Sequence, residues 1–312
     1  MKNGSQKINK NIIPACLRKR WQLYLLLLLP IAYYVIFCYV PMYGAQIAFR
    51  DYSPVKGFTG SPWVGLKHFI RFFNSYYFLR LLTNTVVISA YSIVAGFPFP
   101  ILLAVALNYT KNKFANKSVQ MITYAPYFIS TVVIVGMLMQ FLSARTGAVN
   151  IALTAMGLKE VNFLGNPAYF RSIYVWSDMW QSVGYHSIIY LAALTGVDPQ
   201  LHESAIVDGA NRFKRVWHID LPCILPTIVI VEILAFGGML NIGFEKAYML
   251  QNSMNIATSE IVQTYVYKIA LQSQLPNYSY PSAIGLTLSV MNLLILLIFN
   301  KLSKKISETA LW

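Results

Sequence analysis

The chain has 312 residues, of which 56% are hydrophobic and only 12% are charged, and its mean hydropathy is +0.51. A soluble domain carries about a quarter charged residues, so this composition excludes a chain that covers itself with a polar surface in water. The net charge of +14 would suit nucleic-acid binding, but the basic residues cluster at the ends of apolar stretches, which favours membrane topology as the explanation.

Apolar stretches long enough to cross a hydrocarbon core, which takes about 20 helical residues, occur along the whole chain. The sequence predicts six such spans, at residues 22–40, 81–107, 119–141, 170–191, 226–244 and 281–299. The first span follows a basic run and lacks small residues at a plausible cleavage site, so we expect an uncleaved signal-anchor. The predicted fold class is an all-α integral membrane protein with six transmembrane helices.

Lysine and arginine are concentrated on one side of the predicted membrane. They lie in the tail at 1–20, in the connectors around 111–117 and 212–215, and after the last span at 301–305. Because cytoplasmic segments carry an excess of these residues, both termini are predicted to be cytosolic. The chain then divides into a basic tail (1–20), a first helix with an extracytoplasmic segment (21–80), a core (81–300) and a second cytosolic tail (301–312).

Two acidic residues fall inside predicted spans, Asp178 in the fourth and Glu232 in the fifth. A charge in the membrane is costly and usually faces the protein interior or a water-filled path. Asp178, Gln181 and Tyr185 recur at about helical spacing and Trp180 lies beside them, so a polar stripe lining a substrate path is one interpretation. Hydrogen bonding to a neighbouring helix for packing is the alternative, and it stays open for both carboxylates.

A polar insert separates the fourth and fifth spans, at residues 195–225. Asp198 followed by Pro199 predicts a helix start, and Gly209 can take the left-handed backbone that ends one helix before another begins. We therefore expect two short helices at an angle. They could dock onto a partner protein or lie on the anionic inner leaflet with Arg212 and Arg215 toward the head groups.

The insert resembles the EAA loop of ABC-importer permeases, which docks onto a separate ATPase. Asp208–Gly209–Ala210 and the later Ile219–Asp220–Leu221–Pro222 match its signature, with Ser204 where alanine is usual and Asp220 where threonine or asparagine is usual. The resemblance implies a type I importer transmembrane core over 81–300 with its coupling loop at 195–225. The residues that it assigns to ATPase coupling are Glu203, Ser204, Ala205, Asp208, Gly209, Ala210, Ile219, Leu221 and Pro222.

Other segments are similar to sugar permeases, and some to an LplB-like branch for oligosaccharides from complex polysaccharides. The matching segments are 41–44, 49–54, 63–69, 82–85, 104–108, 125–131, 146–150 and 243–248. The resemblance implies a bacterial cell-membrane permease that takes sugars or oligosaccharides from an extracytoplasmic solute-binding protein. Its implied partners are a second homologous permease, two ATP-binding subunits that hold ATP and Mg²⁺, and the lipid bilayer, with no nucleic acid.

Two other classes of function remain as alternatives. A secondary transporter would show internal repeats and ion-coupling residues at mid-membrane depth, and only Asp178 is a candidate for such a residue. A membrane enzyme would need a motif such as H-E-x-x-H or G-x-S-x-G, and the sequence contains neither. It also lacks the phosphate-binding motif G-x-x-x-x-G-K-[ST], so we expect no ATP hydrolysis by this chain and no bound cofactor or metal.

Overall fold

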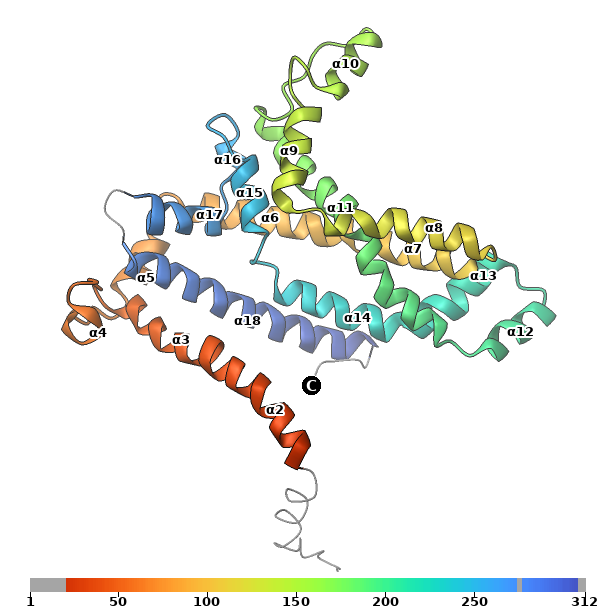
Figure 1. Cartoon of the computed structure of the whole chain (residues 1–312), viewed down its shortest axis with the longest axis horizontal. Helices are drawn as coiled ribbons and strands as arrows, with labels where there is room; N and C mark the ends of the chain where they lie inside the picture. The colour runs from red at the N-terminus through yellow and green to blue at the C-terminus, as the bar shows by residue number, and fades with distance from the viewer. Residues whose placement is uncertain (1–20, 274–276, 308–312) are drawn as a thin grey trace, which may run out of the picture.

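The computed structural model describes residues 21–273 and 277–307, and these are organised as helices without a β-sheet. The predicted basic tail at 1–20 and the end of the predicted second tail, 308–312, lie outside the described residues. Most long helices run along the long axis of the molecule, while α10 projects from one face and α2 diverges from the other helices (Figure 1). The all-α class predicted from the sequence is confirmed for the described residues.

The helices differ widely in length, and several of them are separated by short 3₁₀ or π-helical segments. The α-helices are α2 (Trp21–Tyr34), α3 (Val40–Met42), α4 (Gly57–Gly60), α5 (Lys67–Phe73), α6 (Phe78–Gly96), α7 (Pro98–Tyr109), α8 (Lys113–Tyr124), α9 (Thr131–Phe141), α10 (Ala148–Ala155), α11 (Pro167–Thr195), α12 (Pro199–Val207), α13 (Arg212–Arg215), α14 (Leu221–Gly237), α15 (Phe244–Leu250), α16 (Ile256–Ser259), α17 (Val262–Tyr267) and α18 (Ser279–Ser307). Short 3₁₀ segments occupy Tyr43–Phe49 and Ala125–Phe128, and π-helical turns occupy Val35–Tyr39, Val216–Asp220 and Lys268–Gln272.

Four helical stretches of the described residues are long and apolar enough to cross a membrane. They are Trp21–Phe49, Phe78–Tyr109, Arg212–Gly237 and Ser279–Lys305, and a bent pair of helices makes a fifth if it is counted as one span. Helix α11 has 29 residues and is long enough, but it is rich in Ser, Tyr, Trp and other polar residues and is not one of the four. The structure thus has several apolar spans, in agreement with a multi-pass membrane protein.

The predicted third span, 119–141, is not one straight helix. Helix α8 ends at Tyr124, and α9 begins at Thr131 after a 98° bend. Pro126 lies in the turn between them, where it cannot donate a backbone hydrogen bond to a continuing helix. The Ser130 side chain then caps α9 by accepting from the Val133 amide at 3.5 Å.

The predicted fifth span, 226–244, has the wrong boundaries. Helix α14 already begins at Leu221, continues through Pro226 and ends at Gly237. Pro222 lies in its first turn, where the missing amide hydrogen removes no helical bond, and membrane helices tolerate a later proline. Gly237 and Gly238 close the helix, and a non-helical segment leads to α15.

Helix α11 holds the core together, because it packs against α6, α7, α8 and α14. One buried cluster joins it to α6, α9 and α15 through Ile88, Val135 and Phe170. Another joins it to α7 and α14 through Tyr190 and Ile224. Helix α11 contributes to both clusters and therefore connects them along its length.

A polar clasp joins the start of α6 to α16 and α17. Asn84 donates to the carbonyl oxygens of Ala257 at 2.9 Å and Glu260 at 3.0 Å. The Glu260 side chain is 7% exposed and forms ion pairs with Arg80 and, at 3.1 Å, with Lys268. A buried carboxylate needs such cations, so this clasp fixes α16 and α17 beside α6.

Candidate functional site

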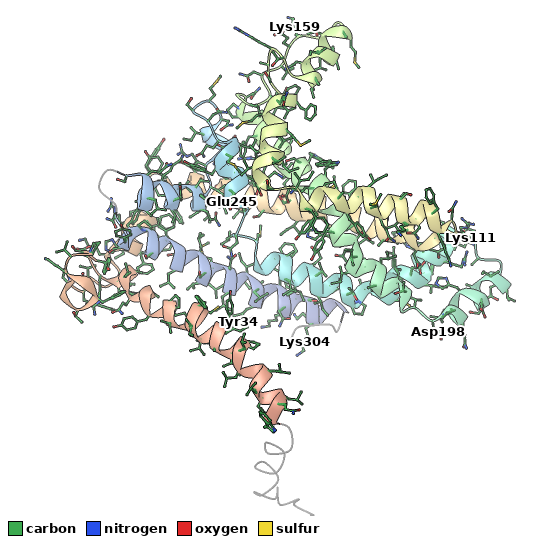
Figure 2. The ribbon with its side chains drawn as sticks, in the orientation of Figure 1. Tyr34, Lys111, Lys159, Asp198, Glu245 and Lys304 are labelled. Atoms are coloured by element: carbon green, nitrogen blue, oxygen red, sulfur yellow. The ribbon has the colours of Figure 1, made fainter. Side chains whose placement is uncertain are left out.

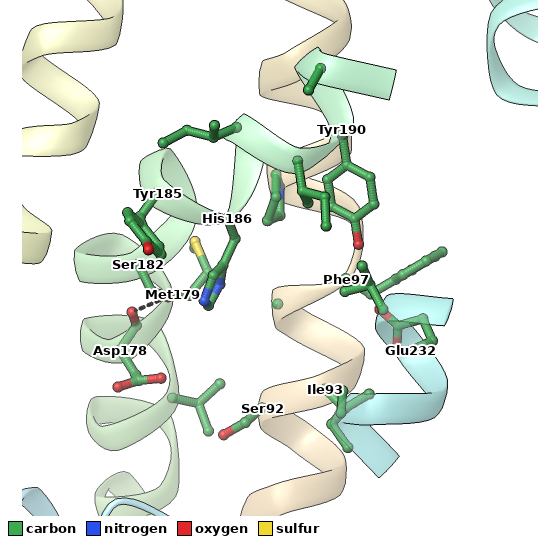
Figure 3. A pocket seen from close by; sticks show the side chains of 18 residues that line it. Ser92, Ile93, Phe97, Asp178, Met179, Ser182, Tyr185, His186, Tyr190 and Glu232 are labelled. Carbon is green, nitrogen blue, oxygen red and sulfur yellow. Dashed lines mark hydrogen bonds between the residues drawn. The ribbon is translucent and has the colours of Figure 1, made fainter. Parts of the chain in front are cut away.

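A cavity of about 620 Å³ lies between α6, α11 and α14, with the start of α7 at its edge. Figure 3 shows Ser92, Ile93 and Phe97 on one side, Glu232 nearby, and Asp178, Met179, Ser182, Tyr185 and His186 along α11. A smaller cavity of about 180 Å³ adjoins it and shares Ser92, Ile93 and Asp178 as lining residues. The fold therefore places a half-open cavity within the part of the chain predicted to cross the membrane.

Asp178 reaches this space and is paired with a lysine that the sequence analysis did not single out. Its Oδ1 lies 3.3 Å from Lys246 Nζ on α15, and the side-chain exposures are 50% for Asp178 and 4% for Lys246. The Lys246 ammonium also lies 5.4 Å from the centre of the Tyr174 ring, and the Tyr174 hydroxyl donates to the Gly243 carbonyl at 3.2 Å. These contacts bring a positive charge to the edge of the cavity and compensate the carboxylate.

The cavity wall combines aromatic rings with hydroxyl groups. Tyr185 stacks on Tyr127 with ring centres 3.9 Å apart and planes 3° from parallel. Ser92, Ser182 and Tyr190 line the same space. A mostly apolar wall with a few placed polar groups is typical of sites for small polar organic molecules, and hydroxyls and carboxylates suit the hydroxyl groups of a sugar.

The five residues predicted to line a substrate path do not all lie together. Asp178, Tyr185 and Glu232 line the cavity. Gln181 instead donates to the Ile129 carbonyl at 2.9 Å, at the bend between α8 and α9, and the half-exposed Trp180 does not line the cavity. The stripe predicted on α11 is therefore split, because Asp178 and Tyr185 face the cavity while the Gln181 side chain is bound at the bend between α8 and α9.

The loop between α11 and α14 has the local structure that its sequence predicts. The Asp198 carboxylate accepts from the Gln200 amide at 2.9 Å and caps α12, with Pro199 in the first turn. Gly209 has a φ of +77°, and the Ala210 amide donates to the Ala205 carbonyl at 2.8 Å as the helix ends. Asn211 then caps α13, and the loop consists of two short helices joined at Gly209.

Large apolar side chains of this loop are exposed. Val207 is 87% exposed, Phe213 75% and Trp217 63%. Of the residues predicted to couple to an ATPase, Glu203, Ser204, Asp208, Gly209 and Pro222 are exposed, and Ala205, Ala210, Ile219 and Leu221 are partly exposed. Apolar groups gathered on a protruding loop are typical of a surface that a partner covers.

The residue that departs from the usual signature, Asp220, is completely buried at the base of this loop. The Tyr109 hydroxyl donates to its Oδ2 at 2.7 Å, and His202 Nε2 lies 3.2 Å from its Oδ1. No local sequence pattern connects these residues, since they belong to α7, α12 and the turn before α14. Within residues 21–273 and 277–307, no group of three or more His, Cys, Asp and Glu side chains is arranged to hold a metal ion.

Comparison with known proteins agrees with this architecture. Residues 96–308 match the family of binding-protein-dependent transport system inner membrane components. Over 93% of the chain and 90% of the relative, the sequence is 42% identical to the polygalacturonan/rhamnogalacturonan transport system permease protein YteP of Bacillus subtilis (strain 168). It is 38% identical to the protein LplB of the same organism, over 95% of the chain and 92% of that relative.

A solved structure has the same fold. A chain in the crystal structure of a bacterial ABC transporter involved in the import of the acidic polysaccharide alginate is 39% identical, with a TM-score of 0.86 over 95% of this chain and 99% of that one. The family match spans more than half of the chain and the relatives align over nearly all of it, which confirms the resemblance found in the sequence. The chain belongs to the inner-membrane components of binding-protein-dependent transport systems, and it is a permease subunit of an ABC importer whose ATPase is a separate chain.

Proposed function

We propose that this permease subunit moves oligosaccharides derived from acidic polysaccharides through the cavity between α6, α11 and α14. The observation that carries the proposal is the cavity itself, where an aromatic and hydroxyl-bearing wall meets a carboxylate already compensated by Lys246. An uncompensated Asp178 would repel the carboxylate of a uronate sugar, and the ammonium group beside it reduces that repulsion. The relatives named for polygalacturonan/rhamnogalacturonan and alginate transport support the same substrate class.

For the membrane arrangement, we propose six spans with both termini in the cytosol. In this arrangement α11 and the bent pair α8–α9 cross the membrane together with the four apolar stretches. Figure 2 shows Lys111 and Asp198 at one end of the molecule and Lys159 on the projecting segment away from it. The end with Lys111 and Asp198 also carries the basic helix α13, so the excess of lysine and arginine in cytoplasmic segments supports this end as the cytosolic one.

For the partners, we propose two ATP-binding subunits, a second homologous permease and an extracytoplasmic solute-binding protein. The exposed apolar tip of the loop at 195–225 supports docking to an ATPase, which would hold ATP and Mg²⁺. A related alginate importer has been solved in complex with an alginate pentasaccharide-bound periplasmic protein, which supports the solute-binding partner. The predicted coupling residues, from Glu203 to Pro222, are proposed as the docking surface.

Docking through the loop is tested by measuring substrate uptake and co-purification of the ATP-binding subunit for one variant and a matched control. Val207→Asp places a charge on the most exposed apolar residue of the loop, and Val55→Asp does the same at a valine 96% exposed in the segment before α4. Val207→Asp is expected to abolish recovery of the ATP-binding subunit and uptake of oligogalacturonate, while Val55→Asp retains both. Equal recovery with both variants would contradict docking through the loop.

Substrate class is tested separately, with the intact transporter in vesicles and ATP inside. Uptake of labelled oligogalacturonate or oligoalginate together with its binding protein is expected, with little uptake of a neutral oligosaccharide of the same length. Uptake of the neutral sugar alone would contradict the acidic class and leave the importer assignment standing. Uptake by this chain alone without ATP would favour the secondary-transporter alternative.

A further inference from the structure

A buried carboxylate joins three elements at the base of the loop. Asp220 has no exposed surface, and it lies where the π-helical turn after α13 leads into α14. The hydroxyl of Tyr109, the last residue of α7, donates to Asp220 Oδ2 at 2.7 Å. His202 of α12 brings its Nε2 to 3.2 Å from Oδ1. A side chain directly before α14 thus contacts both the end of α7 and the exposed helix α12.

The surroundings of Asp220 are charged but incompletely paired. The Arg215 guanidinium lies 5.6 Å from the centre of the Tyr109 ring, so a positive group from α13 approaches the same cluster. Asp220 Oδ1 has no aligned hydrogen-bond donor, although the His202 nitrogen is near it. A buried carboxylate oxygen without a donor is costly, and a small rotation of α12 can make or break the contact with His202.

The helices that meet at Asp220 continue to the cavity. Helix α14 supplies Val231, Glu232 and Ala235 to the cavity wall, and α7 supplies Pro100 near its start. A movement of α12 relative to Asp220 therefore acts on two helices that shape the proposed path. Coupling between distant sites needs a physical element with two arrangements. In the arrangement seen here His202 lies near Asp220 Oδ1, and a second arrangement would break this contact.

We propose that Asp220, Tyr109 and His202 form a latch that passes movement of the docked loop to α7 and α14. This inference rests on the proposed docking of an ATPase to the loop. The three are positioning residues, because they contact neither ATP nor the transported sugar. They are expected to raise the number of substrate molecules transported per ATP hydrolysed. This ratio is predicted to depend on the Tyr109 hydroxyl and the His202 ring.

The experiment uses the complete transporter, with its companion subunits and binding protein, in sealed vesicles. The variants Tyr109→Phe and His202→Gln remove one contact each and keep the size of the side chain similar. Their controls are Tyr39→Phe, at an exposed tyrosine within the N-terminal apolar stretch, and Lys301→Gln, at an exposed lysine of α18 outside the proposed docking surface. Oligogalacturonate uptake, ATP hydrolysis and the yield of assembled complex are measured for each variant.

Tyr109→Phe and His202→Gln are expected to assemble at the normal yield and to hydrolyse ATP, with uptake per ATP about five- to tenfold lower, as for a coupling contact of ordinary strength. Hydrogen exchange of residues 199–207 is expected to be faster in these two variants and unchanged in the controls. Lower yield with an unchanged uptake per ATP would mean that the cluster only stabilises the fold, and would overturn the latch. Failure of the unmodified complex to take up the sugar would instead overturn the proposed substrate, and uptake without an ATPase would overturn the docking on which the latch depends.

Discussion

Helices α11 and α8 approach each other so closely at Gly184 that no side chain fits between them. A Cβ atom built at Gly184 would lie 2.1 Å from the Thr123 carbonyl oxygen and 2.9 Å from the Tyr124 ring. The obstacle at Thr123 is backbone, so a rotamer change cannot remove it. We predict that Gly184→Ala forces the two helices apart and disturbs the stacked Tyr185 beside it.

The expected loss of stability in Gly184→Ala follows from the distances around the added Cβ atom. Cβ atoms in real structures essentially never approach within 3.0 Å, so the two backbones must separate by about 1 Å. Overpacking of this kind costs about 1–3 kcal/mol, while the better helix propensity of alanine returns up to about 1 kcal/mol. Gly285→Ala in α18 is the matched control, because a Cβ there has no neighbour within 4 Å.

The assay compares the thermal unfolding midpoint of both variants in the same detergent and their uptake after reconstitution. Gly184→Ala is expected to unfold several degrees below Gly285→Ala and to lose more uptake than its reduced yield explains, since Tyr185 lines the cavity. If Gly184→Ala unfolds at the same temperature as the control or above it, the close approach of α11 and α8 does not exist in the folded protein and the reasoning is refuted.

Three further outcomes are expected. Lys246→Met leaves Asp178 without its cation and is expected to lower the free energy of unfolding by about 1 kcal/mol, a small loss because water screens the half-exposed carboxylate. Adding Asp178→Asn is expected to restore part of the loss in unfolding temperature and in uptake. Glu260→Gln weakens the pairing of a buried carboxylate with two cations and is expected to lower the free energy of unfolding by about 3 kcal/mol. The same unfolding assay measures it, and an unchanged unfolding midpoint would contradict a stabilising role of the polar clasp. The hydrogen bond from Lys67 lowers the pKa of Asp51 below its ordinary value of 3.8. The stabilisation of the segment before α5 is therefore present above that pH and is lost as the pH falls through the lowered pKa, and pepsin cleavage of the segment is expected to rise only there.

Local chemistry made the loop at 195–225 predictable. Asp198 before Pro199 is a cap that acts within a few residues, and Gly209 was the residue able to take a positive φ. Both features appear in the structure because they depend on neighbours in the chain. The burial of Asp220 was not predictable in this way, since its hydrogen-bond donor, Tyr109, is 111 residues away.

Helix boundaries in the apolar stretches were less predictable. Hydropathy found the apolar stretches, but a continuous apolar run does not reveal a 98° bend at the turn containing Pro126. It also placed the start of the fifth span at residue 226, although α14 begins at Leu221 and continues through Pro226. A proline can end a helix or be accommodated inside one, and packing by neighbouring helices decides between these outcomes.

The sequence by itself determined the membrane class and the two-helix loop. Composition, apolar length and short-range capping act through the chain and the solvent, without any particular tertiary contact. Only the tertiary structure decided that Asp178 meets Lys246, 68 residues away, and that Tyr185 and Glu232 share a cavity from which Gln181 is turned away. These outcomes depend on how α11 rotates and crosses its neighbours, and on a glycine that lets α8 approach, which is a property of the packed helices together.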